Sequence, residues 1–260
     1  MSSDSFFACA AFREDVAIPE AALLAVWSGV VPNERRAKLV AADLADLSLF
    51  TRDEQRCYRI HDLYVDYLHH AAGPLPARHA SLVERYRTAC PTGWASGPDD
   101  GYFFEHLPLH LVEAGKLDDL CATLTDVDQL GKLCSLLAPR RSSDRLERFL
   151  TTALSYIPAA DLLRYRKLAN ISGNLRQFLE CLTLFHPPFI DAIDPKAVCQ
   201  ECGQRTICHL YVDLGGVEIY DNYAVWCLSC FWCLHEEYFQ QAMYADPVWE
   251  FDYDRNVYRP

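Results

Sequence analysis

The sequence predicts a mainly helical protein: a winged helix, then a helical array, then a small α+β module. Apolar residues recur at helical spacing through most of the chain. The N-terminal part follows the order helix, helix, strand, helix, which is typical of a winged helix. Near the C-terminus, two Cys-x2-Cys pairs flank a β-rich segment that contains a Gly-Gly turn.

We assign the winged helix to residues 1–72. Pro19 begins the helix PEAALLAVWSG and Gly29 ends it. A second helix covers ERRAKLVAADLADLSLF, and the alternating segment QRCYRI predicts a short strand. The next helix has one continuous apolar face, formed by Ile60, Leu63, Tyr64, Tyr67 and Leu68.

The helical array follows a break at the segment AAGPLP, where glycine and two prolines interrupt helix formation. We expect residues 73–101 to form a linker with one helix and residues 102–194 to form a helical domain. The segment YFFEHLPLHLVEAGKLDDLCATL predicts a helix pair that turns at Gly115. His106 and His110 have metal-ligand spacing, but Pro108 interrupts the stretch, so we interpret them as structural.

Residues 195–260 contain the strongest chemical signal. Cys199-x2-Cys202 and Cys227-x2-Cys230 are separated by about 24 residues, which is of the order found between paired zinc-ligand motifs. Four cysteines satisfy a tetrahedral metal ion and leave no open position. We therefore expect a structural Zn²⁺ in a treble-clef or zinc-ribbon-like module, with Gly215-Gly216 as the hairpin turn and a helix after the second pair.

Other residues could replace one of these ligands. The spacing leaves open a contribution from Cys208, His209, Cys233 or His235. A second alternative is that all the cysteines are ordinary buried thiols or a redox pair. A catalytic zinc would need three protein ligands, a water and a general base, for which Glu236 and Glu237 are weak candidates.

The composition bears on partners and compartment. The formal net charge of −12 opposes binding to a phosphate backbone, so we do not expect nucleic acid as a partner. Twelve cysteines would suggest disulfides in a secreted chain, but MSSDSFFACAAFRED does not read as a signal peptide. We expect a cytoplasmic protein, with no membrane contact because no apolar stretch approaches the about 18 residues of a membrane span.

Two parts of the chain resemble a known family. FFACAAFREDVAIPEAALLAVW, DLADLSLF and YRIHDLYVDYL resemble the winged-helix domain of NB-ARC, or STAND-class, signalling NTPases. GWASGPDDGYFFEHLPLHLVEAGKLDDLCATLTDVDQLGKL resembles the APAF-type helical domain that follows it in that family. Together the matches cover about residues 5–137. The resemblance implies a signalling role in which these domains contact a nucleotide-binding domain.

The resemblance also singles out His61. In the family, a His-Asp pair at the start of a winged-helix helix senses bound ADP, and Ile60-His61-Asp62 matches that motif. The alternative is a surface histidine beside a helix-starting acid. The sequence has no G-x-x-x-x-G-K-[ST] phosphate loop, so His61 could sense a nucleotide only if another chain supplies the nucleotide-binding domain.

These observations together predict a non-catalytic regulatory or adaptor protein. We expect it to mediate protein interaction in a STAND-type nucleotide-switch assembly, with a separate STAND ATPase subunit as a candidate partner. The aromatic residues Phe231, Trp232, Trp249 and Tyr253 exceed what a small zinc core can bury, so part of them should contact a partner or the helical array. The alternatives are a winged-helix and zinc-finger DNA-binding regulator and a zinc-dependent hydrolase.

Overall fold

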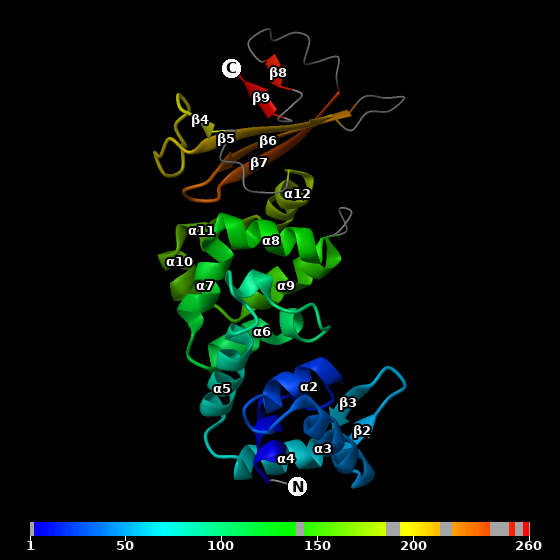
Figure 1. Cartoon of the computed structure of the whole chain (residues 1–260). Coiled ribbons are helices and arrows are strands. Elements are labelled where there is room, and N and C mark those ends of the chain that lie inside the picture. The colour runs from blue at the N-terminus through cyan, green and yellow to red at the C-terminus, as the bar shows by residue number, and fades with distance from the viewer. Residues whose placement is uncertain are drawn as a thin grey trace. The chain divides into compact units, whose positions relative to one another are not determined.

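The computed structural model divides the chain into two compact units, Met1–Leu120 and Cys121–Pro260, each of which we describe by itself (Figure 1). Helices predominate, as predicted. No helix in the described part of the chain is long and apolar enough to cross a membrane. The structure describes residues 3–138, 143–185, 193–213, 220–239, 250–252 and 257–259.

The first unit begins with helices around a small antiparallel sheet. The sheet has the order β1-β3-β2, and its register pairs Phe50 with Ile60 and Ile18 with Tyr58. The predicted strand in QRCYRI is confirmed as β3. The elements in chain order are α1 (Ser3–Ala8), η1 (Cys9–Ala11), β1 (Ile18–Pro19), α2 (Glu20–Trp27), α3 (Glu34–Asp46), β2 (Phe50–Arg52), β3 (Cys57–Ile60) and α4 (Asp62–Ala71).

Local side-chain contacts explain where these elements begin and turn. Asn33 caps α3 by accepting a hydrogen bond from the Arg36 N–H at 2.9 Å. The carboxylate of Asp53 accepts hydrogen bonds from the N–H groups of Gln55 and Cys57, which closes the turn between β2 and β3. The side chain of Trp27 is buried and donates from Nε1 to the Ser5 carbonyl oxygen.

Three further elements complete the first unit: α5 (Leu75–Arg87), η2 (Trp94–Ser96) and α6 (Phe103–Glu113). At Gly97 a side chain would collide with the ring of Phe103, so only glycine fits there. Gly115, in a left-handed conformation, separates α6 from α7 (Leu117–Thr125), and the predicted turn of this helix pair is confirmed.

A buried network of histidines joins α5 to α6. The Nδ1 atoms of His79 and His110 are 2.8 Å apart, so one ring donates a proton and the other accepts it. His110 Nε2 is hydrogen-bonded to the Tyr102 hydroxyl at 2.9 Å, and the Tyr102 ring stacks on His106 at 4.1 Å. Burial lowers the pKa of all three histidines, to about 4 for His106 and well below the ordinary value for His110.

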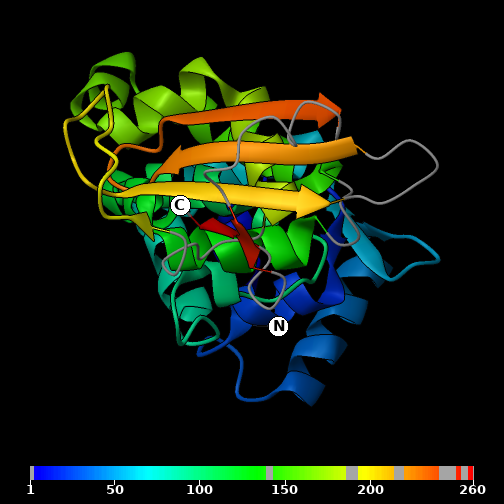
Figure 2. The same ribbon diagram turned by 90° about the horizontal axis from the view of Figure 1, so that it is seen from above.

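The second unit consists of helices followed by a four-stranded antiparallel sheet of order β4-β5-β6-β7. Figure 2 shows the three long strands side by side. The predicted Gly215-Gly216 turn lies outside the described residues. The elements are α8 (Val127–Leu137), α9 (Asp144–Ser155), α10 (Ala159–Arg164), α11 (Arg166–Gly173), α12 (Leu175–Phe185), β4 (Ile193–Asp194), β5 (Ile207–Asp213), β6 (Tyr220–Cys227), β7 (Cys233–Phe239), β8 (Glu250–Asp252) and β9 (Val257–Arg259).

The helix predicted after the second cysteine pair is wrong. Residues 233–239 form strand β7, which pairs with β6 so that Trp226 lies opposite Cys233. The reason is that Phe231 adopts a left-handed conformation and turns the chain back along β6, and the ladder of hydrogen bonds then outweighs the helical spacing of the apolar residues. Without that helix, the module is not a treble clef.

Helix α12 packs against β5 and β7 in this unit. Cys208, Trp226 and Cys233 stand opposite one another on neighbouring strands, so their side chains share one face of the sheet. Phe178 of α12 contacts Trp226 on this face, with ring centroids 5.0 Å apart. The sheet and the preceding helices therefore share one core.

The histidine network predicts that acidification destabilises the first unit. Well above the ordinary histidine pKa of about 6.5, the three histidines are neutral in both the folded and the unfolded chain. As the pH falls below about 6.5, the unfolded chain takes up protons that the folded chain does not. The free energy of unfolding therefore falls until the lowered pKa values of the folded chain are reached. Glu113 raises the pKa of His79 and so partly offsets the effect of burial there. His69 lowers the pKa of His79 further, and Arg13 lowers that of His106.

Urea denaturation at pH 7.5, 6.0 and 5.0 measures this loss. His106→Phe keeps a ring stacked on Tyr102 and should shrink the loss of stability between pH 6.5 and 5. The same measurement on His70→Gln, which changes an exposed histidine, is the control. An unfolding midpoint that does not move between pH 7.5 and 5.0 would contradict the role assigned to the network.

Candidate metal centre

The first cysteine pair lies in a tight chain reversal before β5. Cys199 and Cys202 are followed by Gly203, which has a φ of 72°. The Gly203 N–H donates to the Cys199 carbonyl oxygen at 2.8 Å, and the Cys199 N–H donates to the Gln204 carbonyl oxygen at 2.9 Å. These two hydrogen bonds hold both cysteines on the inside of the turn.

The second pair repeats this geometry between β6 and β7. The Phe231 N–H donates to the Cys227 carbonyl oxygen at 2.7 Å, and the Cys227 N–H donates to the Trp232 carbonyl oxygen at 2.8 Å. Phe231 occupies the position of Gly203, with a φ of 61°. A non-glycine residue is costly there, but burial of its ring against Trp226 and Phe178 offsets the strain.

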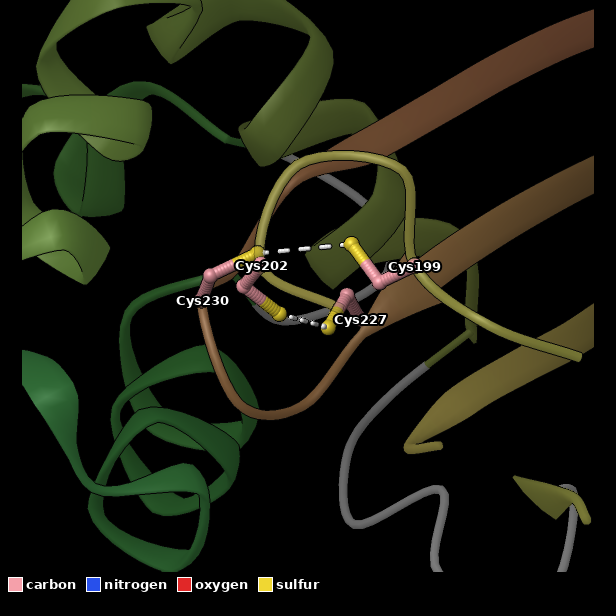
Figure 3. Close-up of side chains that lie close together, drawn as sticks. All are labelled: Cys199, Cys202, Cys227 and Cys230. Carbon is pink, nitrogen blue, oxygen red and sulfur yellow. Dashed lines mark hydrogen bonds between the residues drawn. The ribbon is translucent and has the colours of Figure 1, made fainter. Parts of the chain in front are cut away.

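The two turns bring four sulfur atoms to one point (Figure 3). The Sγ atoms of Cys199, Cys202, Cys227 and Cys230 all lie within 4.8 Å of one another. The distance is 3.7 Å between Cys199 and Cys230 and 3.6 Å between Cys202 and Cys227. A tetrahedral centre with metal–sulfur bonds of about 2.3 Å has sulfur–sulfur edges of about 3.8 Å. The spacing therefore fits one metal ion bound by all four cysteines.

The centre is enclosed by apolar side chains. Cys199, Cys227 and Cys230 are buried, and Cys202 is partly exposed. Ile207 belongs to the same buried cluster, and four partly buried residues pack against it: Ala197, Cys202, Val225 and Trp232. Such surroundings would exclude water from most of the coordination sphere of a bound metal ion.

The thiols of the centre differ in acidity. Burial raises the pKa of Cys227, but the Thr206 hydroxyl and the N–H groups of Cys230 and Ser229 lower it further, so the result is about 7. Burial raises the pKa of Cys199 and of Cys230. Burial therefore favours the neutral thiols of Cys199 and Cys230, and a bound metal ion would supply the positive charge that displaces their protons.

Helix α11 contacts both cysteine turns. The guanidinium of Arg166 donates to the Glu201 carbonyl oxygen at 2.6 Å, and the Asn170 amide donates to the Cys230 carbonyl oxygen at 2.8 Å. Lys167 Nζ lies 4.2 Å from the centre of the Phe231 ring and donates to the Thr125 carbonyl oxygen. Its ammonium group also interacts electrostatically with Cys227 and Cys230. The helix thus supplies positive charge beside the thiolates.

The alternative ligands do not join this group in the described structure. Cys208 and Cys233 share the sheet face of Trp226. His209 Nε2 lies 3.7 Å from a carboxylate oxygen of Asp194. The side chain of His235 lies outside the described part. Among the described side chains, the candidate metal-binding group is Cys199, Cys202, Cys227 and Cys230, the set that the sequence spacing singled out.

His61 lies in the first unit, at the start of α4. Its exposed side chain accepts a hydrogen bond from the Leu63 N–H through Nδ1 and contacts the carboxylate of Asp62. The imidazole therefore acts locally as a helix cap. A role in nucleotide sensing stays a prediction.

The sequence interpretation missed the contacts made by α11. Arg166, Lys167 and Asn170 are ordinary residues of an amphipathic helix, and no motif links them to cysteines that lie more than 30 positions away. It also left open where the aromatic residues pack, and the structure places Phe231 in the core, not at the surface. Trp249 and Tyr253 lie outside the described residues.

No protein-family model and no curated protein matches the chain. The resemblance to NB-ARC proteins therefore stays a hypothesis.

Loss of one ligand should loosen the second unit beyond the cysteine turns. In Cys227→Ser the metal content of protein purified under reducing conditions should fall well below that of the unchanged chain, because metal binding and local folding are coupled. Hydrogen exchange should accelerate in β5–β7, in α12, which packs on β5 and β7, and in α11, which contacts the second cysteine turn. Cys57→Ser, the same change in the first unit, is the control. Unchanged exchange in α11 and α12 would refute the coupling.

The charge of Lys167 should strengthen metal binding. Lys167→Met keeps the length of the side chain but removes the ammonium group beside the thiolates, so we expect the affinity for Co²⁺ to fall by about 10-fold. Lys167→Arg keeps the charge and should retain most of the affinity. Competition with a chromophoric chelator measures both. Equal affinities for the methionine and arginine variants would show that the charge is irrelevant.

Proposed function

We propose that this chain is a non-catalytic regulatory or adaptor protein whose second unit is stabilised by a structural zinc ion. The observation that carries the proposal is the set of four converging cysteines, because four thiolate ligands leave no coordination position for a substrate or an activated water. Tetrahedral thiolate sites select zinc or iron, and zinc adds no redox chemistry. A protein with such a centre acts through its surfaces.

The order of elements in the first unit supports the more specific proposal of a winged helix. The helices and strands follow the order α1, β1, α2, α3, β2, β3 and α4, and the sheet order is β1-β3-β2. In a STAND-type assembly this domain would contact a nucleotide-binding domain supplied by another chain, with His61 at the nucleotide. The exposed position of the His61 side chain is compatible with a role in nucleotide sensing.

The surface of α3 weighs against a DNA-binding regulator. In helix-turn-helix proteins the second helix of the pair enters the major groove, and α3 occupies that position after α2. Arg35 and Arg36 are exposed in the first turn of α3, but Asp43 and Asp46 are exposed in its last turns, and Lys38 is paired with Glu34 and Glu20. Acidic side chains at these positions would face phosphates. Protein, not DNA, is the partner that this helix favours.

Cobalt substitution tests whether the metal site is closed. The Co²⁺ form should show the visible absorption of tetrahedral thiolate coordination and should not change when azide or imidazole is added, because no ligand position is free. A hydrolase would keep one exchangeable position, so an added ligand would shift its spectrum. Elemental analysis of the native protein should find one zinc per chain and no iron. A shifted spectrum would overturn the non-catalytic proposal.

A further inference from the structure

Helix α3 presents an exposed face with an unusual charge pattern. Leu39, which is 49% exposed, lies near the middle of the helix. Arg35 and Arg36 are exposed in the first turn, and Asp43 and Asp46 are exposed in the last turns. One half of the face is therefore basic and the other half is acidic.

This pattern works against the stability of the helix itself. The N-terminal end of a helix carries partial positive charge and the C-terminal end partial negative charge. Arg35 and Arg36 follow Glu34 at the positive end, whereas Asp43 and Asp46 stand at the negative end, and no basic residue occupies the last turn. A sequence that breaks a local rule in this way is expected to gain something elsewhere.

No described contact within the chain explains the pattern. Lys38, on another side of α3, is paired with Glu34 at 2.7 Å and with Glu20 at 3.5 Å. In the described part of the chain, neither Arg35 and Arg36 nor Asp43 and Asp46 lie in an ion pair. The two groups are also too far apart along the helix to pair with each other, because only neighbours three or four residues apart meet.

We propose that this face binds a second copy of the same chain, with the two α3 helices antiparallel. In that arrangement Arg35 of one copy lies opposite Asp46 of the other, and Arg36 lies opposite Asp43. Both pairings are centred within one residue of position 40, so a single two-fold axis beside Leu39 satisfies them at once. An isologous interface requires such self-complementarity.

The remaining chemistry of the face fits this partner. Ala42 is exposed next to Leu39 along the helix, and a small side chain lets a second helix approach closely. Leu47, exposed at the C-terminal end of α3, extends the apolar part of the contact. A helix pair alone is a small interface, so the dimer should be weak and sensitive to salt. This inference does not depend on the zinc centre or on the proposed adaptor role.

Charge reversal tests the dimer in the full, metal-loaded chain. Sedimentation equilibrium at low ionic strength should show a dimer that dissociates as NaCl is raised. R35E/R36E should weaken self-association by at least about 10-fold, and D43R/D46R should do the same, because each double change leaves charges of only one sign on this face. Both changes agree with the helix dipole, so neither should unfold α3. A 1:1 mixture of the two variants should associate again.

The control is E14R/D66R, which makes the same change in net charge as D43R/D46R at exposed positions outside α3. It should dimerise like the unchanged chain. At about 0.5 mM protein and low salt, even a weak dimer is populated. An unchanged chain that stays monomeric under these conditions would overturn the proposal. Dimers that survive both reversals, or binding of a DNA duplex by this face, would overturn it as well.

Discussion

Four thiolates from two separate chain reversals cannot be held together in a buried site unless a cation compensates their charge. The second unit is built around that constraint. Each reversal uses a residue with positive φ, Gly203 or Phe231, to place two sulfur atoms on the inside of the turn. Hydrogen bonds from Thr206 and from backbone N–H groups lower the pKa of the Cys227 thiol. The ammonium group of Lys167, in α11, interacts electrostatically with Cys227 and Cys230. A bound divalent cation would complete this arrangement, because it would accept all four sulfur atoms and cancel part of their charge.

The same centre connects the sheet to the helices of its unit. The Cys230 carbonyl oxygen accepts a hydrogen bond from Asn170, and the Phe231 ring packs between Lys167, Phe178 and Trp226. The residue that closes the second cysteine turn is thus also a core residue. The metal site and the packing of α11 and α12 consequently stabilise one another, and the module is not an independent appendage.

The sequence predicted those features that depend on neighbouring residues. The paired cysteines could be recognised because chelation by a tight turn fixes their spacing, and the helix pair around Gly115 because glycine ends a helix locally. Strand β7 could not be recognised, since CLHEEYF acquires its conformation from pairing with β6. The contacts of Arg166, Lys167 and Asn170 with the cysteine turns are equally remote in sequence. The hydrogen bond between His79 and His110 joins two helices and leaves no trace in the spacing of either.

X-ray absorption at the zinc edge of the native protein tests the central claim most directly. The account predicts four sulfur neighbours at about 2.3 Å and no lighter atom in the first shell. Three sulfur neighbours with one nitrogen or oxygen at about 2.0 to 2.1 Å would contradict it, because a histidine or a water would then complete the site. In that case the ligand set would include a residue other than Cys199, Cys202, Cys227 and Cys230, or the site would be open to a substrate.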